Sequence, residues 1–194
     1  MKNFKRLKIS RIFVILTLLA IFILISAISY VDAVSNNISD SVFRLHVIAN
    51  SDSEEDQTLK LKVRDNLLEY MNTIAKDSTN KEEAMRIASE HKNEFIQIAE
   101  KTIRENGYEY TVNIQIGKAD FPTKYYGDIT LPAGEYDALK VEIGEAKGKN
   151  WWCVMFPPLC FVDVSTGVVP DDSKQELKQN LKNEEYNLIS ITDD

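Results

Sequence analysis

The segment from residue 43 to residue 71 constrains the fold most strongly, because it predicts two elements of secondary structure with almost no linker between them. Apolar side chains alternate with mostly polar ones over residues 43–50, which is typical of a β-strand whose two faces differ. Apolar residues then recur at helical spacing: Leu59, Val63, Leu67 and Met71. The sequence therefore predicts a strand that leads directly into a helix, with this helix packed on the sheet that contains the strand.

The connection between strand and helix is polar and carries the signals of a helix N-terminus. Residues 50–53 have side chains that hydrogen-bond nearby backbone amides, and acidic residues 54–56 follow where carboxylates stabilise a helix start. We expect His46, Asn50 and Asp52 to lie close to the first turn of the helix. A structural cap has the same composition, so the pattern leaves both a structural and a functional role open for these side chains.

The first 33 residues have the layout of an export signal. Five basic residues precede residue 12, residues 12–28 are almost entirely apolar, and small residues stand at the two positions that a signal peptidase reads before a cut after Ala33. We predict that residues 1–33 are a signal peptide, with a retained N-terminal membrane anchor as the alternative. In both cases residues 34–194 form one domain that is delivered across the membrane.

The exported part of the chain is acidic. Residues 34–194 carry 18 basic and 29 acidic side chains, which is a formal net charge of −11, whereas the whole chain has −7. Nucleic acids and anionic lipid surfaces attract Lys and Arg, so an acidic domain without a basic stripe fits neither of them. The charge favours a protein partner, no nucleic acid, and membrane contact through the N-terminal segment alone.

The rest of the chain predicts an α+β fold. A second amphipathic helix begins after residue 80 and ends near residue 107, and strands are expected over residues 108–116 and 139–143. Residues 117–136 are expected to form a long ordered loop with room for one short strand. We predict a mixed, largely antiparallel sheet with two long helices packed on one face and a short C-terminal helix that starts at Ser173.

Residues 151–164 are apolar on both faces, and this pattern leaves two readings. A buried central hairpin is the favoured one, and an exposed patch that binds a partner is the other. In such a hairpin a loop over residues 155–158 sets Cys153 opposite Cys160, so we predict a disulfide between them, with two buried free thiols as the alternative.

Candidate sites for catalysis or cofactors are sparse. The chain has two histidines and two cysteines without the short spacing of zinc ligands, so no metal is predicted. Residues 144–150 differ from a phosphate-binding loop in glycine spacing and lack a hydroxyl residue after the lysine; we expect a solvated turn and no cofactor. The enzyme alternative is an extracytoplasmic hydrolase in which His46 activates Cys153 or Cys160, but apolar neighbours disfavour the thiolate that it needs. We predict no enzymatic activity.

Two sequence blocks resemble the stage II sporulation protein R family of endospore-forming bacteria. The first is RLHVIANSDS at residues 44–53, followed by Asp56-Gln57, Lys60 and the residues 63–65. The second consists of Gly127-Asp128 with LPAGEY at residues 131–136, and of NWWCVMFPPLCF at residues 150–161. Together the blocks span roughly residues 43–164.

The resemblance implies a signalling role. Members of the family are made in the forespore, are exported into the intermembrane space, and cause a membrane-embedded aspartic protease, stage II sporulation protein GA, to process the sigma-E precursor in the mother cell. The family brings no catalytic residues. The motif positions carried over as receptor-interaction candidates are Arg44, His46, Asn50, Ser51, Asp52, Asp56, Arg64, Trp151 and Trp152. Whether these residues contact the receptor or hold the fold stays open from sequence, and for Arg64 an ion pair with Asp65 at the surface is the structural alternative.

Overall fold

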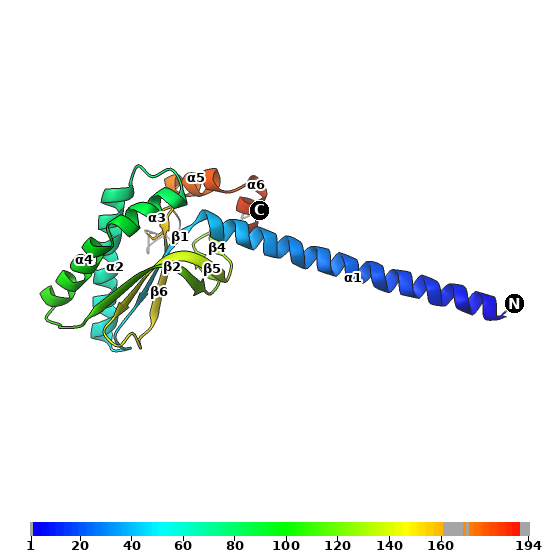
Figure 1. Ribbon diagram of the computed structural model, residues 1–194, viewed down its shortest axis with the longest axis horizontal. Helices are drawn as coiled ribbons and strands as arrows, with labels where there is room; N and C mark the ends of the chain where they lie inside the picture. Colours follow the sequence, from blue (N-terminus) through cyan, green and yellow to red (C-terminus); the bar gives the residue numbers. More distant parts are fainter. Residues whose placement is uncertain (1, 161–168, 170, 191–194) are drawn as a thin grey trace. The chain divides into compact units, whose positions relative to one another are not determined.

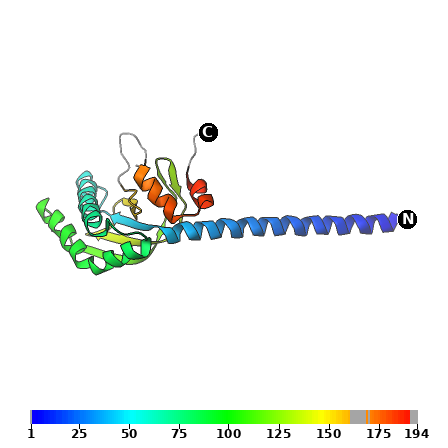
Figure 2. The same ribbon diagram turned by 90° about the horizontal axis from the view of Figure 1, so that it is seen from above.

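The computed structural model of the chain describes residues 2–160, 169 and 171–190. The chain divides into two compact units, residues 1–36 and residues 37–194. Figures 1 and 2 show two views of the chain. The second unit contains every strand among the described residues, and it carries the candidate site.

Helix α1 (Lys2–Ser41) contains the predicted export signal. From Ile12 onward the helix is long and apolar enough to cross a membrane, with a mean hydropathy of 3.0 in its most apolar window. This agrees with either a signal sequence or an anchor, and cleavage after Ala33 stays a prediction. The helix ends at Ser41, and strand β1 (Phe43–Ile48) begins after one residue.

The main sheet has four strands in the order β2-β5-β1-β6. Strand β1 is parallel to β5 and antiparallel to β6, and β2 is antiparallel to β5, so the sheet is mixed and the predicted fold class is confirmed. The other strands of this sheet are β2 (Val112–Phe121), β5 (Gly134–Ile143) and β6 (Asn150–Phe156). All six residues of β1 are buried, because the strand lies between two others and the polar side chains on its second face are covered.

Three helices cover one face of the sheet: α2 (Glu54–Ala75), α3 (Lys81–Glu90) and α4 (Lys92–Glu105). The predicted apolar stripe of α2 is buried there. The sequence predicts one helix between residues 80 and 107, but the chain breaks it at His91, whose backbone leaves the helical region. The His91 ring forms a hydrogen bond of 2.8 Å between Nδ1 and the Tyr70 hydroxyl, which fits a structural histidine.

The segment expected to be a long loop is largely strand. Strands β2 and β5 both extend into it, and the residues between them form a two-stranded hairpin from β3 (Lys124–Tyr126) and β4 (Ile129–Leu131). The C-terminal helix predicted from Ser173 is α5 (Asp171–Asn180), and a further short helix, α6 (Asn183–Ile189), follows it. Figure 2 shows α6 beside the hairpin, where Ile129 and Ser190 form an isolated bridge.

The prediction of a buried central hairpin over residues 151–164 is wrong about where its first strand lies in the sheet. Strand β6 lies at an edge of the four-stranded sheet, and β1 occupies a central position instead. Residues 153–156 are nevertheless buried, since α2 and the disulfide turn pack near this end of the strand. The second half of that hairpin, residues 161–164, lies outside the described part of the chain.

Candidate functional site

The N-terminus of α2 is capped as the sequence predicts. Ser53 has an extended backbone, and its Oγ accepts a hydrogen bond of 3.2 Å from the amide of Asp56. Residues 54–56 are the acidic first turn. Because the cap fixes the point at which α2 begins, the residues between β1 and α2 form a tight loop with a defined shape.

The carboxylate of Asp56 organises this loop from inside. The residue is 5% exposed, and its Oδ2 accepts hydrogen bonds from Asn50 Nδ2 at 2.8 Å and from Ser51 Oγ at 2.5 Å. Burial by itself raises the pKa of Asp56, but the hydrogen bonds that the carboxylate accepts, first from Ser51 and Asn50 and also from Tyr110, together outweigh burial and hold the pKa below its ordinary value. Asp56 is therefore ionised at neutral pH and holds the loop together.

Residues 144–150 form the predicted turn with exposed charged side chains, but their backbone also packs against the loop, which the sequence did not predict. The amides of Lys147 and Gly148 donate to the carbonyls of Asn50 and Ala49 at 3.2 and 2.9 Å. The amide of Lys149 donates to Asp52 Oδ1 at 2.6 Å. We call the surface formed by residues 49–56 and 144–150 the junction.

Two glycines permit this close packing. Gly144 has a φ of +58°, and a Cβ on it would overlap the side chain of Asn50. A Cβ on Gly148 would overlap the backbone carbonyl of Ser51. The glycine spacing that superficially suggests a phosphate-binding loop thus has a different cause, which is the approach of two backbones.

His46 does not lie at the first turn of α2, contrary to the prediction. Its ring is 6% exposed and stacks on Trp152 of β6, with centroids 3.7 Å apart. His46 Nε2 lies 2.7 Å from Asn150 Oδ1, and since an amide oxygen only accepts, Nε2 carries the proton. Burial lowers the pKa of His46 despite the hydrogen bond to Asn150, so the ring is neutral at pH 7.

Arg64 links α2 to β6. Its guanidinium lies 4.2 Å from the ring centroid of Trp151, and its Nε donates to Asp65 Oδ1 at 2.7 Å. The ion pair that the sequence offers as the structural alternative is therefore present, but the same guanidinium also stacks on an aromatic ring. Trp151 and Trp152 use opposite faces of β6, one toward α2 and the other toward His46.

Unlike Asn50, Ser51, Asp52 and Asp56, Arg44 lies away from the junction. Its side chain is 0% exposed and lies on the sheet face opposite the helices, at the other end of β1. The guanidinium carbon is 4.0 Å from the ring centroid of Phe121 and 4.6 Å from that of Tyr136. Its Nη2 donates to the hydroxyl of Tyr126 at 2.6 Å. Direct contact between Arg44 and a partner therefore requires a movement of its surroundings.

Sequence reasoning missed Lys60 as a member of the site. Its side chain is 4% exposed, and its Nζ donates to Gln57 Oε1 at 2.6 Å and to the carbonyl of Lys149 at 3.0 Å. Burial lowers the pKa of Lys60, and the nearby Arg64 acts in the same direction. Lys60 belongs to the first sequence block, but its spacing within the helix did not distinguish it from a surface lysine.

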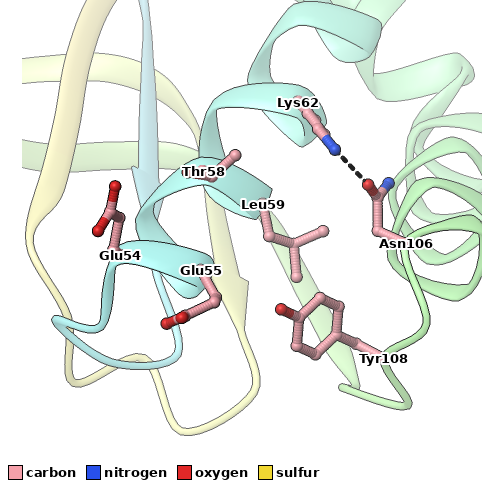
Figure 3. A pocket seen from close by; sticks show the side chains of 7 residues that line it. All are labelled: Glu54, Glu55, Thr58, Leu59, Lys62, Asn106 and Tyr108. Carbon is pink, nitrogen blue, oxygen red and sulfur yellow. Dashed lines mark hydrogen bonds between the residues drawn. The ribbon is translucent and has the colours of Figure 1, made fainter.

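An open groove lies beside the junction on α2. It has a volume of about 400 Å³ and lies between the first two turns of α2 and the end of α4. Figure 3 shows Glu54 and Glu55 at one side, Leu59 and Tyr108 near the middle, and the hydrogen bond of 2.5 Å from Lys62 to Asn106 at the other side. The exposed carboxylates make this side of the junction acidic.

Cys153 and Cys160 form the predicted disulfide, with their Cα atoms 5.3 Å apart. A disulfide sulfur is not a thiolate nucleophile, so the hydrolase alternative has no nucleophile in this oxidised form. Among the described residues, no cluster of three or more His, Cys, Asp or Glu side chains is placed to hold a metal ion. The arrangement provides a charged surface in which Asn50, Ser51, Asp52 and Asp56 are held by hydrogen bonds, whereas His46 Nδ1 and Trp151 Nε1 have no hydrogen-bond partner among the described residues.

Comparison with known proteins gives two matches to the same family. Residues 39–166 match the family model of stage II sporulation protein R. The stage II sporulation protein R of Bacillus subtilis (strain 168) is 41% identical over 148 residues, which cover 75% of this chain and 66% of the relative. The aligned region thus spans slightly less than two thirds of that relative's length. No solved structure matches the chain.

Proposed function

Because the chain belongs to the stage II sporulation protein R family, we propose that it is an exported signal that activates a membrane-embedded protease. The protease is the aspartic protease stage II sporulation protein GA, and its activation leads to processing of the sigma-E precursor in the mother cell. The protein acts by binding and not by catalysis. It is exported from the forespore into the intermembrane space, either secreted or held by its N-terminal segment.

One observation carries this proposal: distant parts of the two family blocks meet in one rigid surface. His46 and Asn150 are 104 positions apart in the sequence and share a hydrogen bond. Asp52 and Lys149, which directly precedes residues 150–161 of the second block, are 97 positions apart and also share a hydrogen bond. Rigid loops held by internal hydrogen bonds lose little conformational entropy on binding, which suits recognition. Contacts within the protein account for the positions of His46, Asn50, Asp52 and Asp56, so no bound substrate is needed to explain them.

The receptor-interaction residues divide into two roles in this proposal. Asp52 and the neighbouring acidic residues are exposed and form the contact surface. Asn50, Ser51 and Asp56 hold its shape from inside, and the stacked pairs His46–Trp152 and Arg64–Trp151 fix β6 against it. The acidic character supports a receptor with basic side chains at the contact, because charge complementarity speeds and orients association.

The substitution Asp52→Asn tests the contact surface. Asparagine keeps an oxygen that can accept from the amide of Lys149, but it removes the charge. In cells that express the receptor protease and the sigma-E precursor, the variant should lower the rate of precursor cleavage about tenfold at equal secreted protein. The matched control is Glu90→Gln, an exposed acid on α3 that should leave cleavage unchanged.

Two outcomes would contradict the proposal. If wild-type protein, supplied outside the receptor-bearing cell membrane, causes no receptor-dependent cleavage, the protein is not the activating signal. If purified wild-type protein turns over a substrate in the absence of the receptor, the protein acts as an enzyme instead. A C-terminal fusion to alkaline phosphatase checks export separately, because the phosphatase is active only outside the cytoplasm and an inactive fusion contradicts export.

A further inference from the structure

Strand β2 forms one edge of the four-stranded sheet, and its outer side carries a row of backbone groups without partners. The amide of Gly144 donates to the carbonyl of Thr111 at 2.8 Å, so these two opposite residues form a hydrogen-bonded pair. Such pairs alternate with non-bonded pairs along an antiparallel ladder, and the register between β2 and β5 runs without a shift. The N–H and C=O groups that point away from β5 therefore belong to residues 112, 114, 116, 118 and 120. Within the described part of the chain, no hydrogen bond reaches these backbone groups.

The opposite edge of the sheet, strand β6, is occupied by other parts of the protein. The carbonyl of Trp152 accepts a hydrogen bond of 3.2 Å from the Tyr126 hydroxyl. The carbonyl of Val154 accepts one of 3.2 Å from the amide of Leu159 in the disulfide turn. The register of β6 against β1 also shifts, and Pro157 follows the strand directly. Covered carbonyls, irregular register and proline all keep a sheet edge from pairing with another chain.

Strand β2 lacks these protective features. It pairs with β5 over ten consecutive residues and contains no proline. A lysine on an edge strand usually guards the edge, but Lys118 Nζ turns back over β5 and donates to Asp137 at 3.2 Å. Val112 and Ile116 lie on the same face as Asp137 and are only half-buried, so an added strand would remove further apolar surface from water. The edge is thus regular, open and incompletely covered.

The chemistry of this edge specifies an extended polypeptide segment as its ligand. Free N–H and C=O groups at strand spacing bind the backbone of a further strand. On one face the added strand would lie beside Val112 and Ile116, and on the other face beside the exposed Asn113 and Gln115. The edge therefore fits a segment in which apolar and polar residues alternate. A second copy of this chain is disfavoured, because residues 34–194 carry a net charge of −11 and like charges repel.

From these observations we infer that β2 is the docking site of an extended extracytoplasmic segment of the receptor, which pairs with β2 and adds a fifth strand to the sheet. The edge begins at the junction, because Gly144 belongs to the junction and bonds to Thr111, which directly precedes β2. A receptor that contacts the junction can therefore continue along β2. The inference rests on the proposed function, since it names the way in which the same receptor is held.

Hydrogen exchange at single-residue resolution tests the pairing directly. The full chain is measured alone and in an isolated complex with the receptor protease in lipid nanodiscs. The amides of Asn113 and Gln115 face β5 and should be protected in both samples. The outward amides of residues 114, 116 and 118 should exchange rapidly in the free protein and at least about tenfold more slowly in the complex. Unchanged exchange of the outward amides in the complex would overturn the inference.

A proline on the open edge tests the same pairing in the cleavage assay. Lys118→Pro removes an outward N–H and places a ring on the edge, and an edge strand tolerates proline where its N–H faces solvent. Lys118→Ala is the matched control, because it also loses the contact to Asp137 but keeps the N–H. At equal folded protein, Lys118→Pro should lower receptor-dependent cleavage of the precursor at least about tenfold relative to Lys118→Ala. If Lys118→Pro does not fold, Asp120→Pro and Asp120→Ala provide the same comparison at the next outward position.

The remaining outcomes separate this inference from its alternatives. Sedimentation of the free full chain in detergent tests self-association: a dimer whose outward β2 amides are protected would assign the edge to a second copy and overturn the inference. If wild-type protein causes no receptor-dependent cleavage, the proposed function fails. If wild-type protein causes cleavage and a folded Lys118→Pro variant acts like Lys118→Ala, only this inference fails.

Discussion

Asp56 and Arg44 are both buried charged side chains, one just after the end of strand β1 and the other near its start, but they differ in how many hydrogen bonds they make. Asp56 follows the C-terminal end of β1 and accepts hydrogen bonds from two side chains that are held in place by the loop. Arg44 lies near the start of β1 with one hydrogen bond to a neutral phenol, and its Nε and Nη1 have no hydrogen-bond partner among the described residues. Both side chains are buried, but the hydrogen-bonding capacity of Asp56 is used more fully than that of Arg44.

Removal of each charge in turn tests this difference between Asp56 and Arg44 most directly. Asp56→Ala leaves Asn50 and Ser51 without their acceptor and should lower the free energy of unfolding by about 3 kcal/mol. Arg44→Met should change it by less than about 1 kcal/mol, because the guanidinium is poorly satisfied in the native state. Urea denaturation measures both values. Equal losses would mean that the aromatic rings satisfy Arg44 as well as the loop satisfies Asp56.

The substitution Gly148→Ala tests whether the two backbones of the junction are closely packed. The added methyl would overlap the carbonyl of Ser51, and backbone atoms yield less readily than a side chain. We expect a loss of about 2 kcal/mol in unfolding free energy and weaker protection of the Lys149 amide from hydrogen exchange. Gly117→Ala is the control, since nothing lies within 4 Å of its added Cβ, and it should leave stability almost unchanged. A tolerated Gly148→Ala would show that the loop can move away.

Replacement of both cysteines by serine tests the opposite end of β6. Cys153 pairs with Leu45 near Arg44, and the bridge closes a turn in which the two cysteines are separated by seven positions. A bridge over so short a loop contributes on the order of 2 kcal/mol, so the double variant should be less stable by about that amount. Cleavage of the precursor should fall only as far as the folded fraction falls. A stable but inactive double variant would favour the hydrolase alternative.

The smallest expected effect is a dependence of stability on pH that comes from His46, which lies within β1 between Arg44 and the junction. Burial lowers the pKa of His46 below 6.5, so at pH values just below 6.5 the unfolded chain binds more protons than the folded one. Stability is therefore fully present above pH 6.5 and declines as the pH falls below it. His46→Phe keeps a ring for stacking on Trp152 and should remove this decline. Unfolding midpoints between pH 7.5 and 5.5 test the prediction; an unchanged slope in the variant contradicts it.

The local elements were predictable because they depend on neighbours in the chain. The alternation before residue 50 and the stripe from Leu59 to Met71 identify β1 and α2, and the polar residues between them identify the cap. The disulfide was predictable too, because a short turn between Cys153 and Cys160 sets the two cysteines opposite each other. The break at His91 was not predictable, because the apolar stripe continues across it.

The candidate site was predictable as a set of residue types but not as a geometry. Sequence placed His46 beside Asn50 and Asp52, whereas the ring stacks on Trp152 and bonds to Asn150, because its neighbours come from β6, which is distant in the chain. The order of the strands decided that β1 is central and β6 lies at an edge, and strand order depends on contacts between distant segments. The docking of residues 144–150 escaped prediction for the same reason.

The sequence by itself determined the apolar N-terminal helix, the acidic charge, the family and the local elements, because each of these depends on composition or on residues close together in the chain. Only the tertiary structure decided which polar side chains find partners. Asp56 receives its donors from residues five and six positions away, and the backbone of residues 147–149 reaches the same loop across about half the chain. Arg44 meets Tyr126 across 82 positions and finds no carboxylate among the described residues. Burial and pairing are properties of the assembled chain, and pairing separates Asp56, which holds the junction together, from Arg44, which has no acidic partner among the described residues.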